Sequence, residues 1–119
     1  MRKHVAIVTG GTRGIGAAIS KKLTENGVTV VANYAGDDEK AKAFTEATGI
    51  AAMKWNVADY DACHAKVKEV EETHGPVTIL VNNAGITRDG TLLKMDRQMW
   101  EDVINVNLGG CFNMSKAVF

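Results

Sequence analysis

The fold is decided by the stretch Val5-Ala6-Ile7-Val8-Thr9-Gly10-Gly11-Thr12-Arg13-Gly14-Ile15-Gly16. Its four apolar residues lead straight into a glycine-rich turn, which predicts a strand buried on both faces. After the turn, Ile15, Ile19 and Leu23 recur at helical spacing, so a helix is expected there. The first amides of such a helix have no partner within it and attract anions. The stretch therefore predicts a site that holds a nucleotide by its phosphates.

The glycine spacing excludes one class of nucleotide site. The usual dinucleotide fingerprint is G-x-G-x-x-G, whereas this turn has its glycines at Gly10, Gly14 and Gly16. The phosphate loop of NTPases requires G-x-x-x-x-G-K-[ST], but Ala17 and Ala18 stand where the lysine and the hydroxyl belong. Because nothing here would reach a γ-phosphate or hold magnesium, an NTPase is not expected.

Strand and helix patterns alternate along the whole chain. Apolar runs predict strands at 4–9, 28–32, 50–55 and 77–81. Helices are expected at about 14–26, from Asp37 or Asp38 to Gly49, from Asp59 or Asp61 to Gly75-Pro76, and from Arg97, capped by Asp96, to the chain end. Since no hairpin pattern interrupts this alternation, the prediction is a single α/β domain with a parallel sheet and right-handed crossovers.

Composition narrows the possible partners. The chain has 119 residues, with 14 basic and 14 acidic side chains. No basic run suggests nucleic acid or a membrane surface, and no apolar run is long enough to span a bilayer. Cys63 and Cys111 have no metal or redox spacing, and His4, His64 and His74 have no companions at ligand spacing. We therefore expect a cytoplasmic protein with two reduced thiols and no metal site.

The last predicted helix carries an anomaly. Its apolar face contains one strongly polar residue, Asn107. Two glycines, Gly109 and Gly110, follow Asn107 within the same helix. Each glycine costs a helix interior about 1 kcal/mol relative to alanine, so we expect the helix to be bent or closely approached. The predicted face consists of Trp100, Val103, Asn107, Cys111, Met114 and Val118.

Three motifs carry a family resemblance. Thr9-Gly10-x-x-x-Gly14-Ile15-Gly16 resembles the cofactor loop of the short-chain dehydrogenase/reductase family. Asn82-Asn83-Ala84-Gly85 and Val106-Asn107 match that family's next two motifs in order, so the resemblance covers the whole chain. It implies a Rossmann-type, doubly wound parallel sheet with four strands and four helices. Residues 1–119 would then be the NADP-binding half-domain, with the C-terminal half absent.

The end of the second strand selects the cofactor. NAD-binding versions place an acidic residue there, about twenty positions after the glycines, to bind the ribose 2′-hydroxyl. This chain has Asn33-Tyr34-Ala35 instead, and Arg13 and Lys40 could supply positive charge to a 2′-phosphate. NADP(H) is therefore favoured, although Arg13 could also be a solvated loop cation.

The resemblance implies further cofactor contacts. Asn56 and Val57 would hold the adenine, with a turn asparagine as the alternative for Asn56 and a helix cap preferred for Asp59. One asparagine of the Asn82-Asn83 pair would tie neighbouring strands together, and the Asn83-Ala84-Gly85 backbone would pass along the ribose. The full predicted set is Gly10, Thr12, Arg13, Gly14, Ile15, Gly16, Asn33, Tyr34, Ala35, Asn56, Val57, Asn83, Ala84, Gly85 and Ile86.

Asn107 is the one catalytic residue that the resemblance implies here. In the family the matching asparagine anchors a water beside the catalytic lysine; a core asparagine bonded to a neighbouring carbonyl is the alternative. The family's serine, tyrosine and lysine would lie after residue 119. Tyr34 and Tyr60 cannot replace the tyrosine, because neither has a lysine four positions on. The chain alone is therefore expected to be inactive.

Other stretches resemble one group within the family. Ile86-Thr87-Arg88-Asp89 resembles the β-ketoacyl reductases, and 32–36, 53–57 and 112–116 resemble the acetoacetyl-CoA reductases of polyhydroxyalkanoate synthesis. The implied reaction transfers a hydride from NADPH to the 3-keto carbon of an acyl thioester on CoA or acyl carrier protein. Asp89 would lie at the substrate mouth or on a simple surface loop. The runner-up is 3-oxoacyl-acyl-carrier-protein reductase.

A different class of function also stays open. The chain could be a nucleotide-binding or assembly module without turnover. Its fourth strand would be an unpaired edge, and its last helix would expose a face that family members bury between subunits. We therefore expect a homo-oligomer, which is a tetramer in the parent family.

Overall fold

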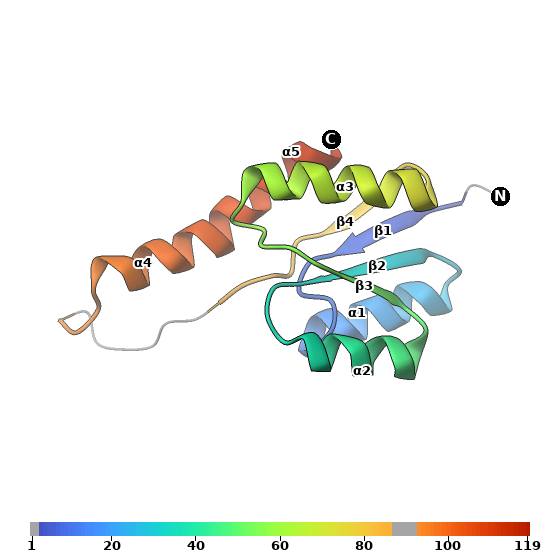
Figure 1. The fold of residues 1–119 in the computed structure, drawn as a ribbon, viewed down its shortest axis with the longest axis horizontal. Helices are drawn as coiled ribbons and strands as arrows, with labels where there is room; N and C mark the ends of the chain where they lie inside the picture. The colour runs from blue at the N-terminus through green and yellow to red at the C-terminus, as the bar shows by residue number, and fades with distance from the viewer. Residues whose placement is uncertain (1–2, 87–92) are drawn as a thin grey trace.

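The computed structural model describes residues 3–86 and 93–119, so Asp89 lies outside the described residues. Figure 1 shows the element order. The strands are β1 (Val5–Val8), β2 (Thr29–Tyr34), β3 (Ala51–Lys54) and β4 (Ile79–Val81). The helices are α1 (Gly14–Glu25), α2 (Asp38–Thr48), α3 (Tyr60–His74), α4 (Arg97–Ile104), the π-helical segment η1 (Asn105–Gly109) and α5 (Gly110–Val118).

All four strands form one parallel sheet in the order β3-β2-β1-β4. This confirms the predicted α/β fold with four strands, and the segments α4, η1 and α5 together make up the fourth predicted helix. Parallel strands end at the same rim of the sheet. The segments that follow β1, β2, β3 and β4 therefore meet at one edge of the molecule.

Each face of the sheet is covered by its own helices (Figure 1). Val5 and Ile7 of β1 pack into a core with residues of α3 and α5, whereas Ala6 and Val8 pack with residues of α1 and α2. The four residues are at most 2% exposed. The continuous apolar run at the start of the chain thus reflects a strand buried on both sides, as predicted.

Aspartate caps begin three of the helices. A side-chain oxygen of Asp37, Asp59 and Asp96 accepts a hydrogen bond from the backbone amide three residues on, at 3.0, 3.0 and 2.8 Å respectively. Asp37 and Asp59 therefore cap α2 and α3 in preference to Asp38 and Asp61. The cap preferred for Asp59 is confirmed.

The last helix is closely approached by another segment at one of its glycines, which is one of the two outcomes predicted. The π-helical segment η1 interrupts it, and Gly110 lies so close to the loop after β3 that an added Cβ would be 2.6 Å from Cγ2 of Val57. The predicted apolar face is only partly correct. Met114 is fully buried, but Trp100 is 57% exposed because α4 extends beyond the end of the sheet (Figure 1).

The buried face of α1 is also rotated from its predicted position. Ile15 is 76% exposed, while Gly16, Ala17 and Ser20 are buried. Small residues face the sheet here because the first turn of the helix lies directly against the glycine loop. Ile19 and Leu23 pack only at the margin of that core.

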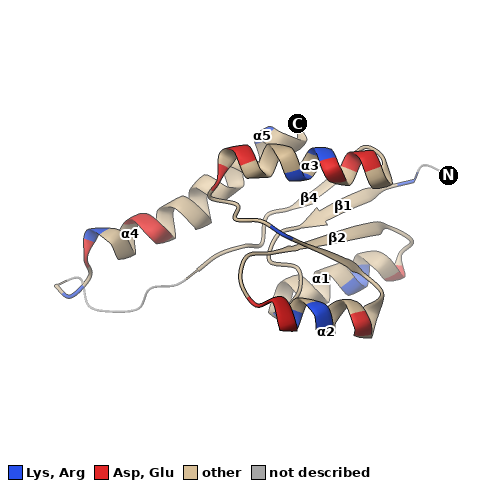
Figure 2. Ribbon diagram, in the orientation of Figure 1, with Lys and Arg blue, Asp and Glu red and all other residues tan. Residues whose placement is uncertain are grey.

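Among the described residues, no helix is long and apolar enough to cross a bilayer, and no three potential metal ligands come together. Figure 2 shows both signs of charge interspersed along α2 and α3. Cys63 is buried, Cys111 is partly buried, and both are free thiols.

Candidate functional site

A cleft of about 830 Å³ lies along the rim where the strands end. Segments from all four strands and from the last helix line it. Every predicted cofactor residue except Ile15 and Gly16 is in its wall. The lining set is Gly10, Thr12, Arg13, Gly14, Asn33, Tyr34, Ala35, Gly36, Asp37, Lys40, Trp55, Asn56, Val57, Ala58, Asn83, Ala84, Gly85, Ile86, Asp102, Asn105 and Val106.

The glycine loop presents unpaired backbone amides at one end of this cleft. Gly10 has φ +61°, and its amide and that of Gly11 are bonded to Asn33. Within the described part of the chain, no protein group accepts a hydrogen bond from the amides of residues 12–16. Arg13 precedes the helix in an extended conformation without a side-chain cap, and the first turn of α1 holds no acidic residue. These donors at a helix N-terminus suit a phosphate group.

Gly16 has a packing role in the same loop. An added Cβ would lie 2.0 Å from the carbonyl oxygen of Gly10 and 2.6 Å from Nδ2 of Asn83. The glycine therefore permits α1 to start directly against the turn. Ile15 and Gly16 do not line the cleft, and the cofactor contact predicted for them stays a prediction.

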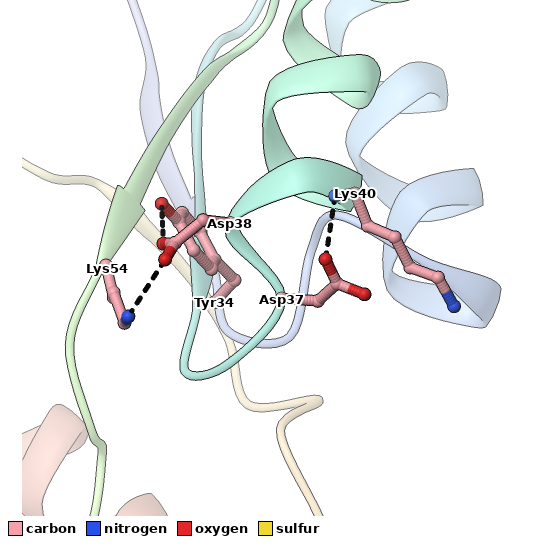
Figure 3. A network of polar contacts seen from close by, with 5 residues as sticks. All are labelled: Tyr34, Asp37, Asp38, Lys40 and Lys54. Atoms are coloured by element: carbon pink, nitrogen blue, oxygen red, sulfur yellow. Dashed lines mark hydrogen bonds and ion pairs between the residues drawn. The ribbon is translucent and has the colours of Figure 1, made fainter.

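Two polar clusters flank the start of α2, at the end of β2 (Figure 3). On one side, the Tyr34 hydroxyl donates to Oδ1 of Asp38 at 3.1 Å, and Lys54 Nζ lies 3.3 Å from Oδ2 of Asp38. On the other side, Asp37 caps the helix and Lys40 extends beyond it. Partial burial, followed by the bond to Asp38, raises the pKa of Tyr34 above its ordinary value. The phenol thus stays protonated and tied to the helix.

The charges that line this end of the cleft favour an anion by a small margin. Arg13 and Lys40 are cationic, and Asp37 is the one acidic residue of the lining set in this region. Asp37 also accepts the backbone amide of Lys40, which directs one of its oxygens toward the helix.

The segment after β3 is held in a tight turn. Oδ1 of Asn56 accepts the Ala58 amide at 2.9 Å, which is the turn role considered as the alternative for this residue. The Val57 carbonyl accepts Nδ2 of Asn113 at 2.9 Å and the Cys63 thiol at 3.4 Å. Helices α3 and α5 therefore fix the backbone that borders the cleft. Both Asn56 and Val57 still line the cleft.

The segment after β4 is fastened to the glycine loop through Thr9. Its hydroxyl accepts the amides of Asn83 and Ala84, each at 2.9 Å. In turn, Nδ2 of Asn83 donates to the Gly10 carbonyl at 3.2 Å. Asn83 thus ties β1 to β4, as the resemblance implied, and leaves the small residues Ala84 and Gly85 beside the cleft.

Asn107 does not line the cleft, but its side chain is hydrogen-bonded to Ile86, which does. Its Oδ1 accepts the Ile86 amide at 2.8 Å, and its Nδ2 donates to the Ile86 carbonyl at 3.0 Å. The residue is in η1 and is exposed, so it is not the core asparagine of the alternative. The bond to a neighbouring carbonyl that the alternative also predicted is present, and the catalytic role stays a prediction.

Several lining residues were not in the predicted set. Asp102, Asn105 and Val106 come from the last helix, and Trp55 and Ala58 flank the predicted pair at 56–57. Asp102 and Asn105 are three residues apart and so share a helix face. The local pattern does not reveal which part of the molecule that face approaches, so these residues could not be found from sequence.

Nearly the whole chain matches one family model. Residues 4–119 match the model described as short chain dehydrogenase. The chain belongs to the short-chain dehydrogenase family. Members bind a nicotinamide cofactor, and the parallel sheet with its glycine turn and rim cleft agrees with that assignment.

Curated relatives in this family are reductases. The chain is 64% identical to acetoacetyl-CoA reductase of Paracoccus denitrificans, over 97% of this chain and 48% of the relative. It is 56% identical to acetoacetyl-CoA reductase of Rhizobium meliloti, over 94% and 46% respectively. It is 50% identical to a 3-oxoacyl-[acyl-carrier-protein] reductase of Staphylococcus aureus, over 91% and 46%. The chain spans about half the length of the curated relatives it matches.

Proposed function

We propose that this chain is the NADP(H)-binding half-domain of a reductase that acts on a 3-ketoacyl thioester. The substrate is acetoacetyl-CoA, which is reduced to 3-hydroxybutyryl-CoA in polyhydroxyalkanoate synthesis. The observation that carries the proposal is the rim cleft, whose wall includes both the glycine loop, with its unpaired amides, and the Asn83–Ile86 backbone. Similarity to two acetoacetyl-CoA reductases supports the substrate.

Each part of the cleft has a distinct binding task in this proposal. The amides of residues 12–16 bind the diphosphate. Asn56 and Val57 hold the adenine edge through the fixed turn after β3. The backbone of 83–86 borders the ribose, and Asn107 keeps that segment in place through its two bonds to Ile86. When bound, the cofactor supplies the hydride for carbonyl reduction.

The charge at the adenosine end supports NADP(H) over NAD(H). An acidic side chain at the end of β2 would repel a 2′-phosphate, and Tyr34 occupies that region instead. Arg13 and Lys40 line the same end. We therefore expect tighter binding of NADPH than of NADH.

Turnover requires groups that this sequence does not supply. Tyr34 is bonded to Asp38, and Tyr60 packs against the ring of His64 at 4.4 Å. Neither tyrosine has a lysine four residues on. We therefore propose that proton transfer to the substrate needs a further polypeptide segment and that this chain alone is inactive.

Two further candidate functions follow from specific observations. The 50% identity to a 3-oxoacyl-[acyl-carrier-protein] reductase supports the same chemistry with a carrier-protein substrate. The exposed edge of β4 supports a module that binds nucleotide and assembles without turnover.

A titration and an assay separate these functions. The purified chain is titrated with NADPH and NADH by fluorescence. NADPH oxidation is then assayed with acetoacetyl-CoA and with acetoacetyl-acyl-carrier protein, with and without a polypeptide carrying the second half of the Paracoccus denitrificans relative. We expect NADPH binding by the chain and turnover only after complementation. Turnover by the chain alone, or a preference for NADH, would contradict the proposal.

A further inference from the structure

Asn33 connects two separate parts of the cleft wall. Its side chain is 2% exposed at the end of β2. Oδ1 accepts the Gly10 amide at 3.2 Å, and Nδ2 donates to the Trp55 carbonyl at 2.9 Å. Its own carbonyl accepts the Gly11 amide at 3.0 Å. One buried residue therefore joins the glycine loop after β1 to the turn after β3.

An asparagine is required for this bridge. The side chain meets a donor at one end and an acceptor at the other, and an amide supplies both complementary atoms at this length. Aspartate has no donor, so one carboxylate oxygen would face the Trp55 carbonyl oxygen in a buried site. Leucine, of nearly the same shape, would leave the Gly10 amide and the Trp55 carbonyl without these partners.

The bridge sets how the two halves of the cleft are arranged. It supplies acceptors to the Gly10 and Gly11 amides, whereas the amides of residues 12–16 have no protein acceptor among the described residues. It also fixes the carbonyl of Trp55, the residue before Asn56 and Val57. We propose that Asn33 is a positioning residue that holds the diphosphate subsite at a set spacing from the adenine subsite, without itself contacting the cofactor.

This inference rests on the proposed function, but it changes the role predicted for Asn33. A direct contact with the ribose or its 2′-phosphate would make Asn33 a determinant of the choice between NADPH and NADH. A positioning role predicts equal losses for both, because both span the same two subsites. A ligand that occupies one subsite should lose less.

The test uses Asn33→Asp, with Asn33→Leu as a second variant. The matched control is Asn82→Asp, at an exposed asparagine after β4 that donates to Ser115. Each chain is titrated with NADPH, NADH and adenosine 2′-phosphate, which reaches the adenosine end only. We expect Asn33→Asp to weaken the binding of both dinucleotides by about tenfold. Without the bridge, only a minor fraction of the molecules would have the two subsites at the spacing that binding requires. Adenosine 2′-phosphate should lose less than about threefold, and Asn82→Asp should bind like the unmodified chain.

Three results would overturn the inference. A changed ratio of NADPH to NADH affinity would show a direct contact with the 2′ group. Unchanged binding of the dinucleotides would show that the bridge has no role in positioning the two subsites. An equal loss for adenosine 2′-phosphate would place the effect at the adenosine end alone.

Amide hydrogen exchange of the unmodified chain tests the bridge without any variant or cofactor. The amides of Gly10 and Gly11 should exchange at least about tenfold more slowly than that of Thr12. Equal exchange would overturn the bridge even if the variants fail to fold. If the unmodified chain bound no nucleotide while these amides were protected, the proposed function would fail and the positioning role with it, although the bridge itself would be established.

Discussion

The side chain of Asn107 makes a reciprocal pair of hydrogen bonds with the backbone of Ile86. Oδ1 accepts the Ile86 amide at 2.8 Å, and Nδ2 donates to the Ile86 carbonyl at 3.0 Å. The two residues are 21 positions apart in sequence. These two hydrogen bonds join the π-helical segment of the last helix to the loop segment that follows β4.

Changing Asn107 to aspartate should loosen this connection. The carboxylate keeps one acceptor but sets its other oxygen against the Ile86 carbonyl. We expect the free energy of unfolding to fall by about 1 kcal/mol, at the low end for such a loss because the pair is exposed. Urea denaturation measures this change. Asn105→Asp, two residues earlier in the same segment, is the control for added charge, and an equal loss in both variants would contradict the prediction.

Gly16 should tolerate no side chain. In Gly16→Ala the new methyl group would lie 2.0 Å from the Gly10 carbonyl oxygen, which belongs to backbone and cannot rotate away. We expect a loss of about 3 kcal/mol in the free energy of unfolding, measured by urea denaturation. Gly36→Ala is the matched control, because nothing lies within 4 Å of its added Cβ. A Gly16→Ala variant as stable as that control would refute the close packing of α1 on the turn.

The two cysteines should differ in reactivity. Burial raises the pKa of Cys63 from 9.0 to about 11, so at pH 8 only about 0.1% of it is thiolate. Cys111 is partly exposed. In the folded chain, a disulfide reagent should modify Cys111 first and Cys63 only after unfolding. Cys111→Ser should remove the fast phase, and a fast phase that survived this change would contradict the assignment.

The same pKa shift predicts a pH dependence of stability. Because folding favours the neutral Cys63 thiol, its contribution is complete below about pH 9 and is lost as the pH rises toward 11. The free energy of unfolding should therefore fall less between pH 8 and pH 10.5 in Cys63→Ala than in the unmodified chain. Urea titrations at both values measure this difference. Identical falls in the two proteins would show that Cys63 does not contribute.

The chain should self-associate. Leu108, Phe112 and Phe119 are 66%, 63% and 85% exposed, and α5 carries one charged residue, Lys116. Strand β4 pairs with β1 on one side only, which leaves an open edge in the described sheet. Light scattering across a concentration series should show oligomers, and Leu108→Ser combined with Phe112→Ser should reduce them. Leu93→Ser, at an equally apolar residue that is 98% exposed, is the control. A monomer at every concentration would contradict the prediction.

Local patterns were sufficient for most of the fold. The apolar run of Val5–Val8, the aspartate caps and the glycine stops give the order of strands and helices, because each depends on neighbours within a few residues. Parallel strands that all end at one rim then bring the glycine loop and the Asn83–Ile86 segment together without further information.

Tertiary structure alone decided which helix faces are buried and which polar side-chain atoms are hydrogen-bonded within the protein. Ile15 is exposed because α1 presents Gly16 to the turn, and Asn107 is exposed beside the backbone of Ile86. Asn33 was predicted to touch the cofactor, but both polar atoms of its side chain are bonded to backbone from two other strand ends. Those partners are 23 and 22 residues away, so only the folded sheet could reveal them.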